Sequence, residues 1–144
     1  MTLNAHIVVL LLVPLVVLHA ESSVLFAEEG KALQPVIIAT NASAETQISA
    51  AVLADYLGRM AATKFEIKPG DGASGIAVGR VEDFPGLKTD VRFKTADATK
   101  REDYLLRSHA KGVRLIGATD LAVRHAVWDF LHRLGYRQFF PGKT

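Results

Sequence analysis

The stretch YLLRSHAKGVRLIGATDLAVRHAVWDFLHRLG, residues 104–135, decides the fold of this chain. Residues 104–107 and 112–117 are two strand-like runs on either side of a polar turn, a pattern that predicts a β-hairpin. The apolar period then changes from two to that of an amphipathic helix. The stretch therefore predicts two paired strands followed by a helix that can lie on them.

The helix predicted over residues 119–134 has well-defined ends. Thr119 is a suitable N-cap, Asp120 favours the positive end of the helix dipole, and Gly135 occupies the position where a helix often ends. One continuous apolar stripe is formed by Val123, Val127, Phe130, Leu131 and Leu134. This stripe is expected to pack on a sheet.

The first half of the chain predicts a second hairpin and a second helix. Residues 24–27 and 35–39 are strand-like runs around a polar turn, and we expect them to pair. Asn41 or Ser43 then starts a helix that is released between residues 58 and 63. Its buried stripe is predicted from residues four apart, namely Ile48, Val52, Tyr56 and Met60, and is widened by Ala51, Leu53 and Leu57.

The remaining segments complete a sheet. Residues 65–67 predict a short strand, and residues 75–79, an apolar run bounded by glycines, predict a buried central strand. Residues 81–100 predict a long surface excursion with one short strand at 91–93, and residues 136–140 predict a final strand. The predicted fold class is α+β, an α/β sandwich with a mixed β-sheet and two main helices packed on one face.

The amino terminus predicts an export signal. Residues 7–18 read IVVLLLVPLVVL, a run of twelve without a charge. A membrane-spanning helix needs about 20 such residues, so the run suits a signal peptide better than a stable membrane anchor. We expect residues 1–20 to be the signal peptide, with cleavage after Ala20 or Ala27, and residues 21–144 to be exported to the periplasm or the extracellular space. An uncleaved signal that tethers the protein to the membrane is the alternative.

The charge balance and the absence of cysteine exclude several kinds of binding partner and site. The net charge is only +2 and both signs are interspersed, whereas a nucleic-acid binder is expected to gather its positive charge on one face. We therefore expect no nucleic acid as a partner. Cysteine is absent, which removes disulfides, thiolate metal sites and cysteine nucleophiles.

Several short patterns that can carry chemistry are better explained structurally. Residues 70–75 match G-x-G-x-x-G, but a strand follows them, so a loop is predicted in place of a nucleotide site. The histidines have no metal-ligand spacing, and we expect His109 to be solvated in a turn and Asp129 to pair with His125 or His132. Neighbouring acids at 28–29, 82–83 and 102–103 are expected to be solvated charge. The residues predict no catalytic, cofactor-binding or metal-binding site.

Three aromatic residues close to the carboxyl terminus are the only candidate contact site. Tyr136, Phe139 and Phe140 can stack on a sugar or dock on another domain, and docking is the favoured interpretation. Because the chain ends soon after this predicted strand, at a Pro-Gly turn, we expect a further domain to follow it in the complete protein.

Three motifs carry a resemblance to a known family. They are the helix AAVLADYL at residues 50–57, the strand GIAVG at 75–79, and the segment from residue 117 to 142 with AVWDFLHRLGYR and FPG. Together they resemble the N-terminal accessory domain of bacterial α-glucuronidases and the related second domain of β-hexosaminidase-like glycoside hydrolases. The resemblance covers nearly all of residues 24–144.

This resemblance implies a role in carbohydrate metabolism without catalysis by the chain itself. In such enzymes the catalytic residues lie on a barrel domain, which this chain lacks. The expected function is an exported, non-catalytic accessory domain, here a fragment whose catalytic barrel is C-terminal or supplied in trans, with polysaccharide as a further candidate partner. The alternative is a free-standing carbohydrate- or partner-binding module.

Overall fold

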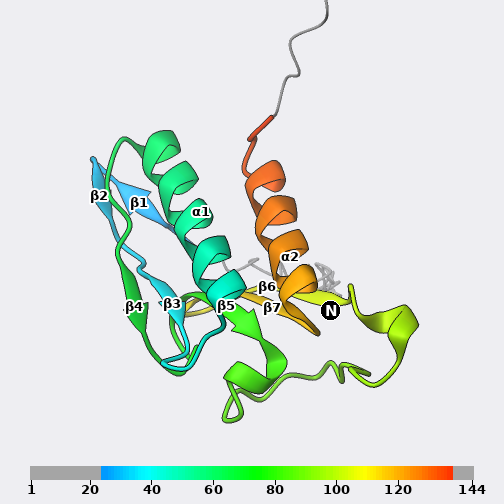
Figure 1. Cartoon of the computed structure of the whole chain (residues 1–144). Helices are drawn as coiled ribbons and strands as arrows, with labels where there is room; N and C mark the ends of the chain where they lie inside the picture. The colour runs from blue at the N-terminus through cyan, green and yellow to red at the C-terminus, as the bar shows by residue number, and fades with distance from the viewer. Residues whose placement is uncertain (1–23, 138–144) are drawn as a thin grey trace, which may run out of the picture.

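The computed structural model describes residues 24–137, which form one layer of two helices on one β-sheet (Figure 1). The helices are α1 (Ala44–Ala61) and α2 (Asp120–Arg133). The strands are β1 (Ala27–Glu28), β2 (Lys31–Ala32), β3 (Val36–Ile38), β4 (Ile67–Pro69), β5 (Gly75–Arg80), β6 (Tyr104–His109) and β7 (Gly112–Gly117).

Five strands form the main sheet in the order β4-β3-β5-β7-β6. The first four of these are parallel to one another, and β6 is antiparallel to β7. Figure 1 shows α1 and α2 side by side on the same face of this sheet, and one apolar core joins both helices to β3, β5 and β7. The predicted α+β class, with a mixed sheet and two helices on one face, is confirmed.

The segment that decides the fold behaves as its sequence predicts. The β6–β7 hairpin is present, and Thr119 caps α2 by accepting a hydrogen bond from the backbone N–H of Ala122 at 3.3 Å. Gly135 follows the helix at φ +104°, a conformation that favours glycine. Leu134 is the exception in the predicted stripe, because its side chain remains 37% exposed beyond the last turn.

Helix α1 begins where predicted but buries only part of the predicted face. Ser43 is its N-cap, and the helix continues past Gly58 to Ala61. The predicted buried stripe is confirmed only in part: Leu53 and Leu57 are buried, whereas Ile48 is 64% and Met60 is 46% exposed. The buried side begins with small residues, Thr46, Ser49 and Ala50, which let α1 approach α2 and the sheet closely, so packing buried one side of the wide apolar stripe and left the other exposed.

The first hairpin is also different from the prediction. Strand β1 pairs with β2 across a tight turn at Glu29 and Gly30, which have φ values of 49° and 75°. Residues 24–27 therefore do not pair with β3, which lies in the main sheet between β4 and β5. The reason is burial: Val36 is fully buried in the core beneath the helices, a position that a two-stranded hairpin does not provide.

Strand β4 is shifted by two residues from its predicted position at 65–67. Phe65 turns into the core, where it is 4% exposed, and only the following residues, Ile67–Pro69, pair with β3. Pro69 is acceptable there because β4 is an edge strand, which needs fewer backbone donors than a central one.

The excursion after β5 covers the opposite face of the sheet. No strand forms at 91–93; the excursion contains two short 3₁₀ turns, Val81–Asp83 and Ala98–Lys100. It is not wholly at the surface, since Phe84 is 3% exposed and belongs to a second, smaller core. That core consists of Ala39, Ala77, Phe84, Leu105 and Ile116.

The ends of the chain leave some predictions open. Tyr136 and Arg137 are not in a strand, and Phe139 and Phe140 lie outside the described residues, as do the predicted signal peptide and Ala20. Within residues 24–137, neither helix has the length and apolar character needed to cross a membrane.

Candidate functional site

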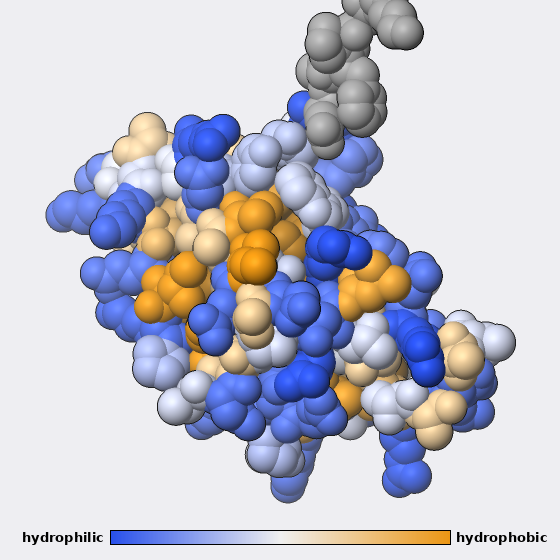
Figure 2. All heavy atoms as spheres, in the orientation of Figure 1, coloured by the Kyte–Doolittle hydropathy of each residue, from blue (hydrophilic) through white to orange (hydrophobic). Residues whose placement is uncertain are grey.

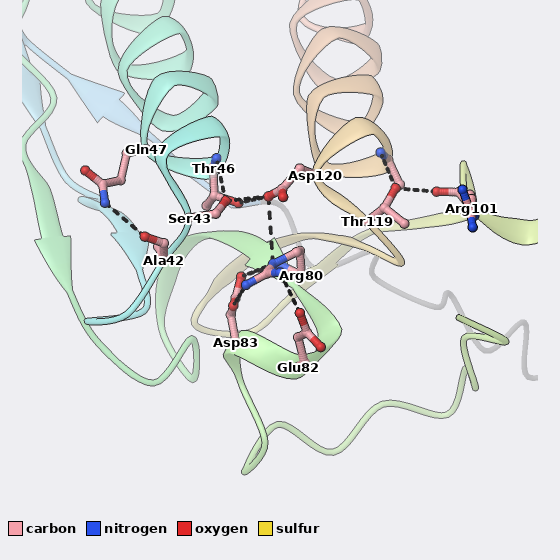
Figure 3. Close-up of polar contacts among 11 residues, drawn as sticks. Ala42, Ser43, Thr46, Gln47, Arg80, Glu82, Asp83, Arg101, Thr119 and Asp120 are labelled. Atoms are coloured by element: carbon pink, nitrogen blue, oxygen red, sulfur yellow. Dashed lines mark hydrogen bonds and ion pairs between the residues drawn. The ribbon is translucent and has the colours of Figure 1, made fainter. Parts of the chain in front are cut away.

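The most connected group of polar side chains lies where three parallel strands end. The carboxyl ends of β3, β5 and β7 meet the amino ends of α1 and α2 there, as Figure 3 shows. In open α/β sheets this edge is the usual place for a ligand, because loops and helix amino termini converge on it.

Asp120, in the first turn of α2, is the centre of this group. Its Oδ1 accepts a hydrogen bond from Ser43 Oγ at 2.5 Å and another from Thr46 Oγ1 at 3.0 Å (Figure 3). Ser43 Oγ also accepts from the backbone N–H of Thr46 at 3.1 Å. One carboxylate therefore ties the amino terminus of α1 to that of α2.

Arg80, at the end of β5, joins two further carboxylates to Asp120. Its Nη2 is 2.9 Å from Asp83 Oδ1, its Nη1 is 2.5 Å from Glu82 Oε1, and its Nε is 3.7 Å from Asp120 Oδ1. The Asp83 hydrogen bond is the main cause that raises the pKa of Arg80. Burial opposes this shift, and the other two carboxylates add to it.

Asp83 contradicts the prediction that residues 82–83 are merely solvated. The Asp83 side chain is 1% exposed, while the Glu82 side chain is 67% exposed. Asp83 Oδ2 also accepts the backbone N–H of Arg80 at 2.8 Å, so this carboxylate closes the turn after β5. Burial is possible because Arg80 supplies both a countercharge and hydrogen bonds.

The chemistry of this group is structural. Each of the three carboxylates accepts from the arginine or from a hydroxyl, and both hydroxyls at the centre, those of Ser43 and Thr46, donate to the carboxylate of Asp120. Nucleophilic catalysis needs a base that removes the serine proton and a third group that orients that base. The arrangement is a clamp between strand ends and helices.

A second candidate region lies at the other end of the helices, around Tyr136. Its ring centroid is 4.6 Å from that of Tyr56 and 5.7 Å from that of Trp128. The two tyrosine hydroxyls are 3.4 Å apart, and this hydrogen bond is the main cause that raises the pKa of Tyr136. Tyr136 is thus held in an aromatic cluster, and its ring is half-buried there.

An apolar groove of about 270 Å³ lies near the carboxyl ends of both helices. Three of its large side chains are exposed to solvent: Leu25 (54%), Met60 (46%) and Leu134 (37%). Figure 2 shows hydrophobic side chains reaching the surface over the helical layer. The groove is lined by Val24, Leu25, Phe26, Ala27, Leu57, Met60, Ala61, Phe65 and Leu134.

The histidine and glycine patterns have structural roles. His125 Nδ1 lies 3.5 Å from Glu102, and Asp129 binds Arg133 and the hydroxyl of Tyr104, so the predicted pairing of Asp129 with a histidine was wrong. His109 is half-buried at the end of β6 and not solvated in a turn. Residues 70–75 form a loop that enters β5, as predicted.

Within residues 24–137, no group of three histidine, cysteine or acidic side chains is placed to hold a metal ion. The chain matches no protein-family model and no curated protein sequence.

Sequence signals were weak for the apolar groove and for the Asp120 clamp, the polar cluster formed by Ser43, Thr46, Arg80, Glu82, Asp83 and Asp120. An arginine directly after a buried strand, followed by two acids, was the available sign of the clamp. The groove had no local sign, because its lining comes from four separate segments of the chain.

Proposed function

We propose that this chain is the non-catalytic accessory domain of a glycoside hydrolase of the α-glucuronidase type, exported from the cytoplasm. The observation that carries the proposal is the apolar groove at the carboxyl ends of the helices. Exposed Leu25, Met60 and Leu134 form a hydrophobic surface of the kind that packs against another protein domain.

The polar groups of the described residues support a non-catalytic role. The carboxylates of the Asp120 clamp are engaged with Arg80 and with hydroxyls, and they sit at the opposite ends of the helices from the groove. The resemblance of the helix at residues 50–57 and the segment 117–142 to the accessory domain then supplies the partner: the catalytic barrel of such an enzyme, in the same chain or in trans.

Tyr136 favours domain packing over sugar binding. Because its ring contacts Tyr56 and Trp128, it orders the segment that leaves α2 beside the groove. A sugar-stacking aromatic needs one open face, which this cluster restricts.

Binding to a catalytic domain tests the proposal. The purified chain is titrated with a bacterial α-glucuronidase barrel that lacks its own accessory domain, and calorimetry measures the dissociation constant. We expect Met60→Glu to weaken binding at least tenfold, because it places a charge in the groove. Ile48→Glu is the matched control, since Ile48 is an exposed apolar residue of the same helix outside the groove.

Two results contradict the proposal. One is the absence of binding, or equal weakening by both variants. The other is turnover of aryl glucuronides or aryl hexosaminides by the chain alone. The carbohydrate-binding alternative replaces the accessory-domain proposal if the chain binds oligosaccharides, loses that binding in Tyr136→Ala, and does not bind the barrel.

A further inference from the structure

Basic side chains gather on the sheet face opposite the helices, near the β6–β7 turn. Alternate residues of a strand share a face. Arg107 and His109 of β6 therefore lie on the same side as Leu105, and Arg114 of β7 on the same side as Ile116. Leu105 and Ile116 belong to the smaller core on the far side from the helices, so the basic residues belong to that face too.

Two of these residues form an unfavourable pair. Arg107 and Arg114 are direct partners in the register of β6 and β7, and like charges opposite each other destabilise a sheet. The loop after β5, which covers this face, offsets the repulsion between the two arginines only in part. Arg107 pairs with Asp90, and Arg114 Nη1 donates to the backbone oxygen of Lys88 at 3.3 Å.

Two donors in the cluster are unused. Arg114 Nε and His109 Nε2 are buried atoms that have no hydrogen-bond partner within the described part of the chain. His109 Nδ1 accepts from the backbone N–H of Lys111 at 3.4 Å, so in the neutral ring the proton is on Nε2. Burial and then the charges of Arg114 and Lys111 lower the pKa of His109.

We propose that Arg107, His109, Lys111 and Arg114 bind an oxyanion of the phosphate or sulfate type. The cluster carries three permanent cations, Arg107, Lys111 and Arg114, of which Arg107 pairs with the carboxylate of Asp90, and a doubly charged oxyanion balances the other two. Guanidinium groups bind such oxygens through parallel N–H donors, and buried donors without partners are costly until an acceptor arrives.

This site goes beyond the accessory-domain function. It lies on the opposite face of the sheet from the helices and the apolar groove, so either proposal can fail without the other. The shared ligand chemistry is the tetrahedral oxyanion, whether free in solution or esterified to a sugar.

Calorimetric titration of the full chain tests the site. Inorganic phosphate, inorganic sulfate and glucose 6-phosphate are compared at constant ionic strength set with chloride. We expect saturable binding of one anion per chain, weakened about tenfold by Arg114→Gln, because a charge-assisted hydrogen bond is lost. Arg124→Gln removes the same charge from an exposed position of α2 and is expected to bind like the unchanged chain.

The outcomes distinguish a specific oxyanion site from non-specific attraction of anions to the basic side chains. Tighter binding of glucose 6-phosphate than of phosphate identifies the ester as the source, and equal affinity identifies the free anion. If Arg114→Gln does not fold, Lys111→Gln in the exposed turn takes its place, with a smaller expected loss. Non-saturable heats, or equal weakening by Arg124→Gln, overturn the proposal.

Discussion

The two faces of the sheet are stabilised by different means. The helical face buries a continuous apolar core in which Leu53, Leu115 and Leu131 are fully buried. The other face is covered by an irregular excursion that buries Phe84, packs Leu87 and Phe93 against the same small core, and depends on polar anchors such as Asp83. A helix covers a sheet with its periodic stripe, whereas a loop must be fixed by individual contacts.

The largest expected effect is on the helical face. Leu53→Ala should lower the free energy of unfolding by about 3 kcal/mol, because it removes buried methyl groups and leaves a cavity. Ile48→Ala on the exposed side of the same helix should cost under about 0.5 kcal/mol. Urea unfolding measures both free energies, and equal losses would mean that α1 buries Ile48 as deeply as Leu53.

On the loop-covered face, the anchor at the end of β5 is the sensitive point. Asp83→Asn should cost about 2 kcal/mol, because Arg80 loses its buried countercharge and the turn loses a strong acceptor. Glu82→Gln changes the exposed partner of the same arginine and should cost under about 0.5 kcal/mol. Denaturant unfolding again gives both values; a larger loss for Glu82→Gln would show that the turn is not closed by Asp83.

The side-chain hydrogen bonds at the starts of the two helices should give a smaller difference in the free energy of unfolding. Ser43→Ala should cost about 1.5 kcal/mol, since Ser43 caps α1 and donates to the charged Asp120. Thr119→Ala, which removes a cap and a hydrogen bond to the neutral backbone oxygen of Arg101, should cost about 1 kcal/mol. Thermal unfolding compares the stability losses of the two variants. A larger loss for Thr119→Ala would show that the contact between α2 and the loop at Arg101 is stronger than the contact between the two helices.

The smallest effect is a pH dependence on the loop-covered face. Burial first, and then Arg114 and Lys111, lower the pKa of His109 below its ordinary value of 6.5. In the window below pH 6.5 the unfolded chain therefore binds the proton more readily, and stability falls as the pH decreases. His109→Gln should flatten the stability profile between neutral pH and pH 5. His132→Gln, on the exposed side of α2, is the matched control, and an unchanged profile in His109→Gln would contradict the assignment.

Sequence patterns predicted the helix ends better than the buried faces. Thr119, Gly135 and Ser43 were assigned correctly because capping depends on a few neighbouring residues. The buried face of α1 was assigned only in part, because the wide apolar stripe of helical period contains both Leu53, which is buried, and Ile48, which is exposed. Only contact with α2 and the sheet distinguishes between them.

The candidate sites also depend on contacts between distant segments, which local sequence patterns do not predict. The prediction that Tyr136 contacts a sugar or another domain did not include its packing on Tyr56 and Trp128. These two residues come from different helices, and no local pattern joins them to Tyr136. Asp83 was assigned to solvent because adjacent acids are usually solvated. Its burial depends on the direction in which Arg80 leaves β5, which is a property of the assembled sheet.

The sequence by itself determined the α+β class, the β6–β7 hairpin, the central strand and both helix starts, because these depend on periodicity and capping over short distances. The tertiary structure alone decided which stripe of α1 is buried, where β3 pairs, and how Asp120, Arg80 and Asp83 come together. These features join residues far apart in the chain, and the free energy that selects them comes from burial and countercharges that exist only once the layers have packed.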